Sequence, residues 1–437
     1  MTAKQLKQGQ KPREDKVIGS AKFEWRGWRF GIALVAACLT AFGAQSADPI
    51  RIGFGMGLTG GLASNGKAAL MTWQMWAEEV NAKGGLLGRK VEFVYYDDQS
   101  SPAAVPGIYT KLLDIDKVDL VVSGYGTNLA APAMPIVMQR NLMFIGLFAL
   151  ALNTEFNYPS YFTMFPVGPE PKTDFTRAFF DLAMSQNPKP QSLAIVAADA
   201  EYSQLAAQGA RAHAKRLGLK TVYDRSYPPA TVDFTPIVRA VQAAGPDIVF
   251  VGSYPPDSAG LVRAASEIGL KTKQFGGAMA GLQFASIKTQ LGPLLNGVVD
   301  YDFYVPEPTL KFPGIERFLE RYQAKAAEGG VDPLGFYLPP FAYAEMQILG
   351  QAITATGGLD NKKLADYLHS ATFETVVGDV KFAANGEWAR SHVLQVQFQG
   401  ITGNGLDQFK RPGTQVIVWP PEVKSGALRY PLQDARN

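Results

Sequence analysis

The chain has 437 residues, of which 47% are hydrophobic and 19% are charged. This composition is typical of a globular protein with two or three domains, or with one two-lobed unit, and it excludes a disordered chain. The net charge of +3 comes from the first 47 residues, which have five more Lys/Arg than Asp/Glu, so the remainder carries −2. We therefore expect no basic surface for nucleic acid or membranes.

Residues 1–46 are expected to be a signal peptide that is removed. A long basic region ends at Arg29, the apolar run Phe30–Phe42 follows, and small residues lead to Ser46. A run of about 13 residues is too short to span a bilayer and is typical of a secretory signal. No later segment has membrane-spanning length, so we expect the mature protein to be soluble.

Cys38, the only cysteine, lies in this leader. Val35–Cys38 is similar to a bacterial lipobox, which would make Cys38 a lipid anchor. The alternative is an ordinary apolar residue of the signal, which the apolar continuation Leu39–Phe42 favours. With ordinary cleavage the mature chain has no cysteine, which excludes disulfides, thiol catalysis and cysteine-based metal sites.

From residue 48 onward, apolar strand-like runs alternate with segments of helical periodicity, the pattern of parallel βαβ units. In the first series, strands are expected at Ile50–Met56, Val91–Asp97, Leu120–Ser123 and Leu142–Leu147, and helices at Asn65–Lys83, Pro102–Ile115 and Ala130–Gln139. Gly84 and Gly85 are expected to end the first helix, because glycine accepts the left-handed conformation.

Asn153–Pro171 interrupts this alternation with prolines and aromatic residues, and a second series follows. It predicts strands at Ser192–Ala197, Thr221–Asp224, Asp247–Gly252 and Gly297–Phe303, and helices at Ser203–Leu217, Phe234–Ala244, Asp257–Ile268, Phe312–Glu328 and Phe341–Thr356. The tail from Val376 is β-rich. Two similar series predict an α/β protein with two lobes and a ligand cleft between them.

A glycine motif opens the first series. Gly55, Gly57 and Gly60 match the spacing of the dinucleotide-binding fingerprint. In that fingerprint an acidic residue that binds the ribose ends the second strand, about 20 residues after the glycines. Here the acids at the end of the second strand, Asp97 and Asp98, come about 40 residues after the glycines, roughly twice that spacing. A tight strand-to-helix turn needs the same glycines, and we expect no cofactor. Thr59 to Asn65 should instead rim the cleft, with backbone N–H groups as donors.

Catalytic and metal-binding patterns are thin. His213, His369 and His392 are isolated; we place His213 on a polar helix face, His369 at a helix end and His392 before a strand, each as a surface or structural residue. Asp97 and Asp98 form either an acid–base pair or, as we favour, turn and cap residues. We expect no enzyme activity and no metal site.

The segment Ser123–Asn128 follows a buried strand and precedes a helix. Thr127 and Asn128 place hydroxyl and amide groups beside free backbone N–H groups, an arrangement that can bind a carboxylate. Plain N-capping explains the same residues equally well.

The chain resembles, over nearly its whole mature length, the periplasmic solute-binding proteins of ABC importers for branched-chain amino acids, the leucine-binding type. The resemblance rests on the order and spacing of IRIGFGMGLTGGLASNG, EEVNAKGGLLGRKVEFVYYDDQSSP, LVVSGYGTNLAAPA, AIVAADAEYSQ, DIVFVGSYPPDSAGLVRAASEIGLKTKQFGG and VVGDVKFAANGE. It implies the type I periplasmic-binding fold: two Rossmann-like lobes with parallel sheets that close on a ligand, without covalent chemistry, and dock on a membrane permease.

The resemblance also implies lobe boundaries. Lobe 1 is expected at 47–165 plus 302–376, lobe 2 at 166–301 plus 377–432, and a tail at 433–437. The three crossings between the lobes are expected near Thr163–Val167, Val299–Asp302 and Thr375–Gly378.

Ligand-binding residues are implied one at a time. Thr127 corresponds to the hydroxyl that meets the ligand carboxylate, and Asn128 adjoins it. Asn65 corresponds to a first-loop contact, and Tyr202 and Tyr254 to tyrosines of the second lobe. Ala149 replaces the threonine that helps hold an α-ammonium, and Met279 replaces its acidic partner. Leu147, Phe148 and Met279 are then expected to make the cleft apolar.

A buried ammonium without a carboxylate partner is unfavourable by several kcal/mol, on the order of the penalty for an unpaired ion. We therefore expect an organic acid without an α-amino group, with aromatic acids first and branched-chain keto or fatty acids next. An alignment slip could hide another acid, with Asp257 the nearest candidate. The alternatives are a binder of branched-chain or hydrophobic amino acids, and a ligand sensor for a receptor or regulator. We expect a monomer that works with an ABC permease and no nucleic acid.

Overall fold

The computed structural model describes residues 48–436. The expected signal peptide, its cleavage site and Cys38 lie outside the described residues. Among the described residues, no helix is both long enough and apolar enough to cross a membrane.

The first sheet is parallel and is built from the first series of strands. Its order is β2-β1-β3, and the bridge between Tyr125 and Leu147 leads on to the parallel pair β4-β5. The strands are β1 (Ile50–Met56), β2 (Val91–Asp97), β3 (Leu120–Val121), β4 (Phe144–Gly146) and β5 (Tyr161–Thr163). Ile50, Ile52, Phe54 and Met56 on one face of β1 are fully buried, and Gly53 and Gly55 on the other face are buried too, as expected for a parallel strand covered on both faces.

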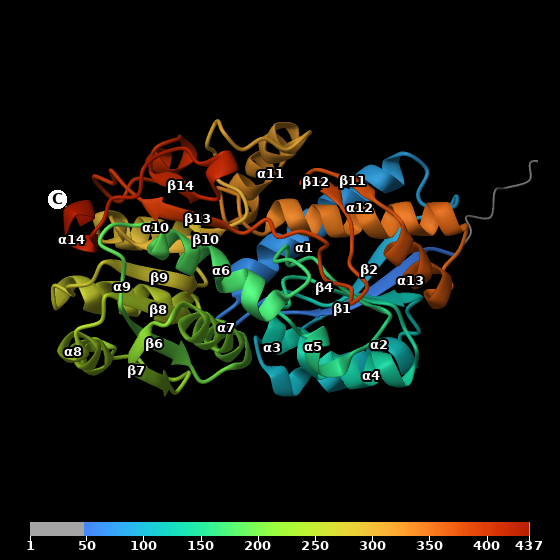
Figure 1. The fold of residues 1–437 in the computed structure, drawn as a ribbon. Coiled ribbons are helices and arrows are strands. Elements are labelled where there is room, and N and C mark those ends of the chain that lie inside the picture. Colours follow the sequence, from blue (N-terminus) through green and yellow to red (C-terminus); the bar gives the residue numbers. More distant parts are fainter. Residues whose placement is uncertain (1–47, 437) are drawn as a thin grey trace, which may run out of the picture. The chain divides into compact units, whose positions relative to one another are not determined.

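The second sheet has seven strands in the order β14-β13-β10-β9-β8-β6-β7. The pairs of β10 with β13 and of β13 with β14 are antiparallel, and the others are parallel. The strands are β6 (Ser192–Ala198), β7 (Lys220–Tyr227), β8 (Ile248–Ser253), β9 (Gln274–Met279), β10 (Val299–Asp302), β13 (Leu394–Phe398) and β14 (Gln415–Trp419). Figure 1 shows the two sheets side by side, each with its own helices.

Most helices match the sequence prediction within a few residues. They are α1 (Ala63–Ala82), α2 (Val105–Asp114), α3 (Thr127–Ala130), α4 (Met134–Gln139), α7 (Glu201–Leu217), α8 (Thr235–Ala244), α9 (Pro255–Glu267), α11 (Ile315–Gly329) and α12 (Pro339–Thr356). The sequence analysis missed α5 (Asn153–Phe156), α6 (Pro171–Met184), α10 (Ala285–Leu291), α13 (Asn361–Ser370) and α14 (Leu432–Arg436), together with strands β5, β9 and β11 (Phe373–Thr375).

The glycines of the first turn serve close packing. A Cβ at Gly66 in α1 would lie 2.1 Å from the carbonyl oxygen of Gly57, so the helix can approach the end of β1 only with glycine there. Gly85, at φ 80°, ends the first helix as predicted, and its N–H donates to the carbonyl of Val80 at 2.9 Å. The motif therefore shapes a strand-to-helix turn.

Asp97 and Asp98 have structural roles at the end of β2. Asp97 accepts hydrogen bonds from the N–H groups of Leu58, Thr59 and Gln99 and from the Thr59 hydroxyl. Burial opposes its charged form, but these donors outweigh burial and the pKa of Asp97 lies below its usual value. The prediction that the Thr59–Asn65 backbone supplies ligand donors is therefore wrong for Thr59, whose N–H is taken by Asp97.

Helix α12 joins the first lobe although it is distant in sequence. It packs along α1, and Trp73 Nε1 of α1 donates to the carbonyl of Ala342 at 3.0 Å. The hairpin of β11 (Phe373–Thr375) and β12 (Gly378–Val380) packs beside α12. The apolar face predicted for α12 is core packing: its side chains are fully buried at Ala342, Met346, Leu349 and Ile353.

One of the three predicted crossings differs from the structure, and a second lies at the end of a strand. Val299–Asp302 is strand β10 inside the second sheet, so the chain leaves that sheet after it. Thr375 and Gly378 pair across the hairpin β11–β12, so the third passage comes later in the chain. There, His392 N–H donates to the carbonyl of Pro166, which joins the third passage to the first. Hinge segments made of short extended pieces carry too little sequence signal to be located alone.

The lobe boundaries stay a prediction. A boundary between 376 and 377 would divide the hairpin β11–β12, and the predicted tail 433–437 overlaps α14, whose Leu432 and Ala435 are buried.

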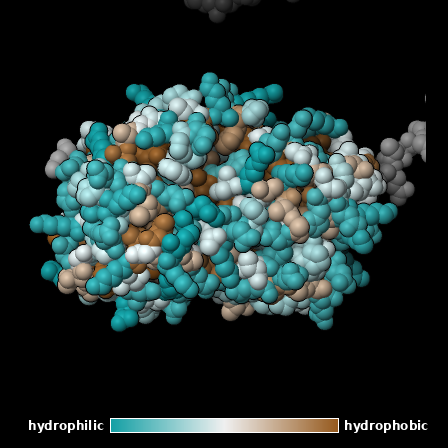
Figure 2. Space-filling view, viewed as in Figure 1, coloured by the Kyte–Doolittle hydropathy of each residue, from teal (hydrophilic) through white to brown (hydrophobic). Residues whose placement is uncertain are grey.

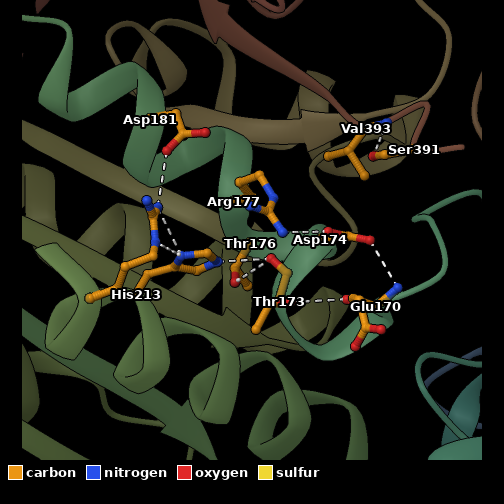
Figure 3. A network of polar contacts seen from close by, with 10 residues as sticks. Glu170, Thr173, Asp174, Thr176, Arg177, Asp181, His213, Ser391 and Val393 are labelled. Atoms are coloured by element: carbon orange, nitrogen blue, oxygen red, sulfur yellow. Dashed lines mark hydrogen bonds and ion pairs between the residues drawn. The ribbon is translucent and has the colours of Figure 1, made fainter.

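His213 corrects another prediction, because it is buried and does not lie on a polar helix face. Figure 3 shows its place between α6 and α7. Its Nε2 bonds to the carbonyl of Thr173 at 2.8 Å, and Nδ1 accepts from Arg216, which also pairs with Asp181. Burial lowers the pKa of His213, and the Arg216 charge adds to that effect. The neutral ring is therefore a packing residue of this helix pair.

The surface seen in Figure 2 is mainly hydrophilic, with apolar residues in separate patches. Large apolar side chains are instead gathered inside, where one continuous core cluster joins both sheets. Glu345 of α12 is an exception within this core. It is fully buried, and neither carboxyl oxygen meets a hydrogen-bond partner among the described residues. Burial raises the pKa of Glu345 well above its usual value.

We expect Glu345→Gln to stabilise the protein at neutral pH, by about 1–3 kcal/mol, because a buried polar group without a partner is unfavourable and a charged one more so. The folded-state pKa of Glu345 is raised, so its penalty is small below the unfolded-state pKa and grows as pH rises. Urea unfolding at pH 5 and pH 8 should show the larger gain at pH 8. The exposed Glu374→Gln is the control. Equal gains at both pH values would contradict this account.

Candidate functional site

A pocket with about 350 Å³ of empty space, part of which is open solvent, lies where the two sheets' connecting loops meet. Its walls come from both lobes and from the first crossing, and they share an uncharged, largely aromatic character. We call this space the cavity. The residues that line it are Leu62, Tyr125, Gly126, Thr127, Asn128, Phe148, Phe165, Tyr202, Tyr254, Pro255, Ala280, Tyr301 and Tyr337. Helices α3 and α7, which begin on opposite sides of it, contact each other. The lobes thus meet around the cavity.

Five of the nine predicted binding residues line this cavity: Thr127, Asn128, Phe148, Tyr202 and Tyr254. Asn65 is buried beside it. Its side chain lies next to the Tyr125 hydroxyl, and the residue lines an outer groove together with Gly60, Gly61 and Ser64.

Leu147, Ala149 and Met279 are buried but are not among the lining residues. Leu147 N–H donates to Ser123 Oγ, and the Ala149 carbonyl accepts from Thr163 Oγ1. Met279 ends β9, where its N–H donates to Asp300 Oδ1 at 3.0 Å. These three residues therefore pack in the core and do not line the cavity.

Sequence reasoning missed three of the cavity's five tyrosines, Tyr125, Tyr301 and Tyr337. Tyr125 lies in the Ser123–Asn128 segment between a strand and a helix, so its position at the strand end could have identified it as a cavity residue. Tyr301 occupies β10, and Tyr337 precedes α12. Nothing local distinguishes either from a core aromatic residue, because the two become neighbours only through the fold.

The polar groups of the cavity are hydroxyls, amides and backbone N–H groups. Thr127 Oγ1 accepts from Leu150 N–H at 2.9 Å, which leaves its own proton free to donate. The N–H groups of Thr127 and Asn128 donate to no group among the described residues. Asn128 Oδ1 and the Tyr254 hydroxyl are buried without a partner there. Buried groups in this condition are usually satisfied by a ligand or water.

The aromatic rings pack edge to face around the cavity. Tyr202 and Tyr254 have ring centroids 5.8 Å apart, and Phe148 and Tyr337 are 5.0 Å apart, both nearly perpendicular. Phe148 has φ 55°, a left-handed conformation that is strained for a bulky residue. Strain of this kind clusters at ligand sites, where surrounding packing maintains it.

Two tyrosine hydroxyls cross-link the floor of the cavity. Tyr301 and Tyr337 are joined at 2.8 Å between their oxygens. Tyr202 donates to the carbonyl of Ala278 at 3.3 Å. Burial raises the pKa of Tyr125 to about 12 and that of Tyr202 well above its usual value, so these hydroxyls keep their protons.

Acidic groups lie near the cavity but outside its lining. Asp300 is fully buried, and its oxygens accept from Met279 N–H and from Gln283 Nε2 at 3.1 Å. Asp257, the candidate for an ammonium partner, lines a groove outside the cavity and accepts from the Tyr227 hydroxyl at 3.1 Å. Within residues 48–436, no cluster of three or more His, Cys, Asp or Glu is arranged to hold a metal.

Comparison with known proteins identifies the family to which this architecture belongs. The sequence profile of the family described as periplasmic binding protein matches residues 49–400. The Leu/Ile/Val-binding protein homolog 7 of Brucella abortus is 25% identical over 413 residues, which cover 92% of this chain and 98% of that protein.

Two solved structures share the fold. A branched-chain amino acid transporter substrate binding protein from Streptococcus pneumoniae, in complex with isoleucine, has a TM-score of 0.68 at 20% identity and covers 82% of this chain and 97% of its own. A solute binding protein of an ABC transporter from R. palustris, in complex with 4-hydroxybenzoate, has a TM-score of 0.68 at 21% identity. The match covers 82% of this chain and 94% of that protein. The α/β architecture with its mostly parallel sheets is the type I periplasmic-binding fold, and the chain belongs to the periplasmic binding protein family, with relatives of the leucine-binding type.

Proposed function

We propose that this chain is the solute-binding component of an ABC importer and that it captures an aromatic carboxylic acid in the cavity. Ligand contacts to both lobes would favour the closed arrangement, which a membrane permease then recognises. The observation that carries the proposal is the absence of any charged side chain among the described residues that line the cavity.

An α-amino acid would bring an ammonium group into this space. A buried ammonium needs an anionic partner, and a missing partner leaves a penalty of several kcal/mol, on the order of that for other buried unpaired ions. Asp300 is already bonded by Met279 and Gln283, and Asp257 lines a neighbouring groove that shares Asn128 and Tyr254 with the cavity. Among the described residues, no acidic side chain lines the cavity itself to pair with an α-ammonium.

A carboxylate fits the donors that remain. The free N–H groups of Thr127 and Asn128 and the Thr127 hydroxyl proton lie on one wall, and the Tyr254 hydroxyl has no partner on another. Uncharged donors can stabilise a buried carboxylate because hydrogen bonds to charged groups are stronger than neutral ones. Aromatic rings of Phe148, Tyr202 and Tyr337 suit a flat ligand ring, which packs edge to face or offset against them.

The rival function is binding of a branched-chain or hydrophobic amino acid, as the names of several relatives indicate for those proteins. The two functions differ in one chemical group, the α-ammonium, so ligand selectivity separates them.

Calorimetric titration of the mature protein with benzoate, 4-hydroxybenzoate and leucine tests the proposal. We expect saturable binding of at least one aromatic acid and no detectable heat from leucine at the same concentrations. A thermal-shift measurement should agree, because a ligand that binds only the folded form raises its melting temperature. Tight leucine binding with no response to either aromatic acid would overturn the proposal and favour the amino-acid alternative.

Thr127→Val tests the carboxylate contact. We expect the affinity for the bound aromatic acid to fall roughly ten- to a hundredfold, because a hydrogen bond to a charged group is worth about 1.5–3 kcal/mol. Thr110→Val on the exposed face of α2 is a matched control that should leave the affinity unchanged. Unchanged binding in both variants would show that the carboxylate lies elsewhere.

Asp257→Asn tests the electrostatics of the groove. Burial raises the pKa of Asp257 to about 6, partly offset by bonds from Tyr227 and the Tyr254 backbone. The wild-type carboxyl therefore becomes charged as pH rises through that value and repels an anionic ligand. We expect the variant to bind an aromatic acid roughly two- to threefold more tightly at pH 8 and equally at pH 5, because a charge outside the cavity lining, screened by solvent in its groove, contributes below about 1 kcal/mol to binding. A gain that is equal at both pH values would contradict this explanation.

A further inference from the structure

A buried lysine that does not line the cavity lies near acids of the two segments that supply the floor tyrosines. Lys288 of α10 is fully buried, and its Nζ donates to Gln415 Oε1 of β14. Burial lowers the pKa of Lys288 to about 8, and Asp302 and Asp332, which are also buried, partly oppose that shift without forming an ion pair with Lys288. An ammonium in this position needs anionic partners because burial removes its hydration. The three side chains, hereafter the Lys288 cluster, are therefore coupled.

The two acids of the Lys288 cluster belong to the two segments that supply the floor tyrosines. Asp302 follows Tyr301 at the end of β10, and its Oδ1 accepts from the N–H groups of Phe303 and Tyr304 at 2.8 and 3.4 Å. It thereby fixes the chain at the point where it leaves the second sheet.

Asp332 fixes the other segment. It lies between α11 and α12, whose packing against α1 assigns them to the first lobe. Its Oδ1 accepts from Ala285 N–H in the first turn of α10 at 3.1 Å, and its Oδ2 accepts from Gly335 N–H at 3.3 Å. The chain that leads to Tyr337 is thus bonded to a helix of the second lobe.

Helix α10 contacts Tyr337 directly as well. The ring of Phe284, which precedes α10, meets the Tyr337 ring edge to face at 5.4 Å between centroids. Tyr337 in turn shares the 2.8 Å hydroxyl bond with Tyr301. Helix α10 is therefore linked to both tyrosines of that bond. Asp332 and Phe284 link it to Tyr337. Lys288 and Asp302 link it to the chain that carries Tyr301.

We propose that Lys288 and Asp332 are positioning residues for the ligand site: with Asp302 they hold the Tyr301–Tyr337 hydroxyl pair in place and so set the ligand affinity without touching the ligand. The effect on affinity rests on the proposed function of the cavity. The effect on the hydroxyl pair does not, so the two can be tested separately.

The first test needs no ligand. Asp332→Asn removes the charge and keeps the size, and the double variant Lys288→Met/Asp332→Asn removes both charges if the single variant folds poorly. We expect faster hydrogen exchange at the amides of Ala285, Leu334 and Gly335 in the unliganded variant, and a crystal structure with the 2.8 Å hydroxyl pair broken. The exposed pair Lys362–Asp366, changed to Met and Asn, is the matched control. Wild-type exchange at these amides with an intact hydroxyl pair would overturn the proposal.

The second test uses whichever of benzoate or 4-hydroxybenzoate the wild type binds. Both Asp332→Asn and Tyr337→Phe should weaken it about tenfold, the value of one hydrogen bond. Their combination should cost no more than either alone, because coupled residues are not additive. Full affinity in Asp332→Asn, or additive losses in the combination, would overturn the positioning role. Failure of both probes on wild type would count against the proposed function, while the first test would still decide the hydroxyl pair.

Discussion

The hydrogen bond between Tyr301 and Tyr337 is the contact on which the candidate site depends. One tyrosine lies on β10, inside the sheet of the second lobe, and the other lies just before α12 of the first. A bond of this kind between two buried hydroxyls has a fixed geometry and no competing water. It closes the floor of the cavity and ties each lobe's wall to the position of the other.

The distribution of charge around the cavity follows one physical constraint. Charged groups are expensive to bury, so acids near the site are bonded into backbone or side-chain networks. Asp97, Asp300 and Asp332 each accept backbone N–H groups, and none lines the cavity. The cavity itself keeps donors and acceptors that have no partner, notably the Tyr254 hydroxyl. The charged acids are thus bonded outside the cavity, and the cavity lining is uncharged. This distribution is consistent with a ligand that is itself charged.

Much of the fold was readable from local patterns. Continuous apolar runs such as Ile50–Met56 indicate parallel strands covered on both faces, and the Gly84-Gly85 stop marks a helix end whose chemistry is local. The missed elements α10 and β9 are short or glycine-rich, so their periodicity is weak. His213 was misplaced because its neighbours on α7 are polar, while its burial comes from packing against α6.

The sequence by itself determined the family, the two-lobed α/β architecture and some of the cavity-lining residues that follow strand ends, among them Thr127, Tyr202 and Tyr254. These depend on local conformation and on motif order, which a single chain carries. Only the tertiary structure decided that Tyr301 and Tyr337 share the cavity floor, that Leu147, Ala149 and Met279 do not line the cavity, and that Asp257 lines a neighbouring groove. Those facts concern residues distant in sequence, and their contacts exist only once both sheets have formed and the lobes have met.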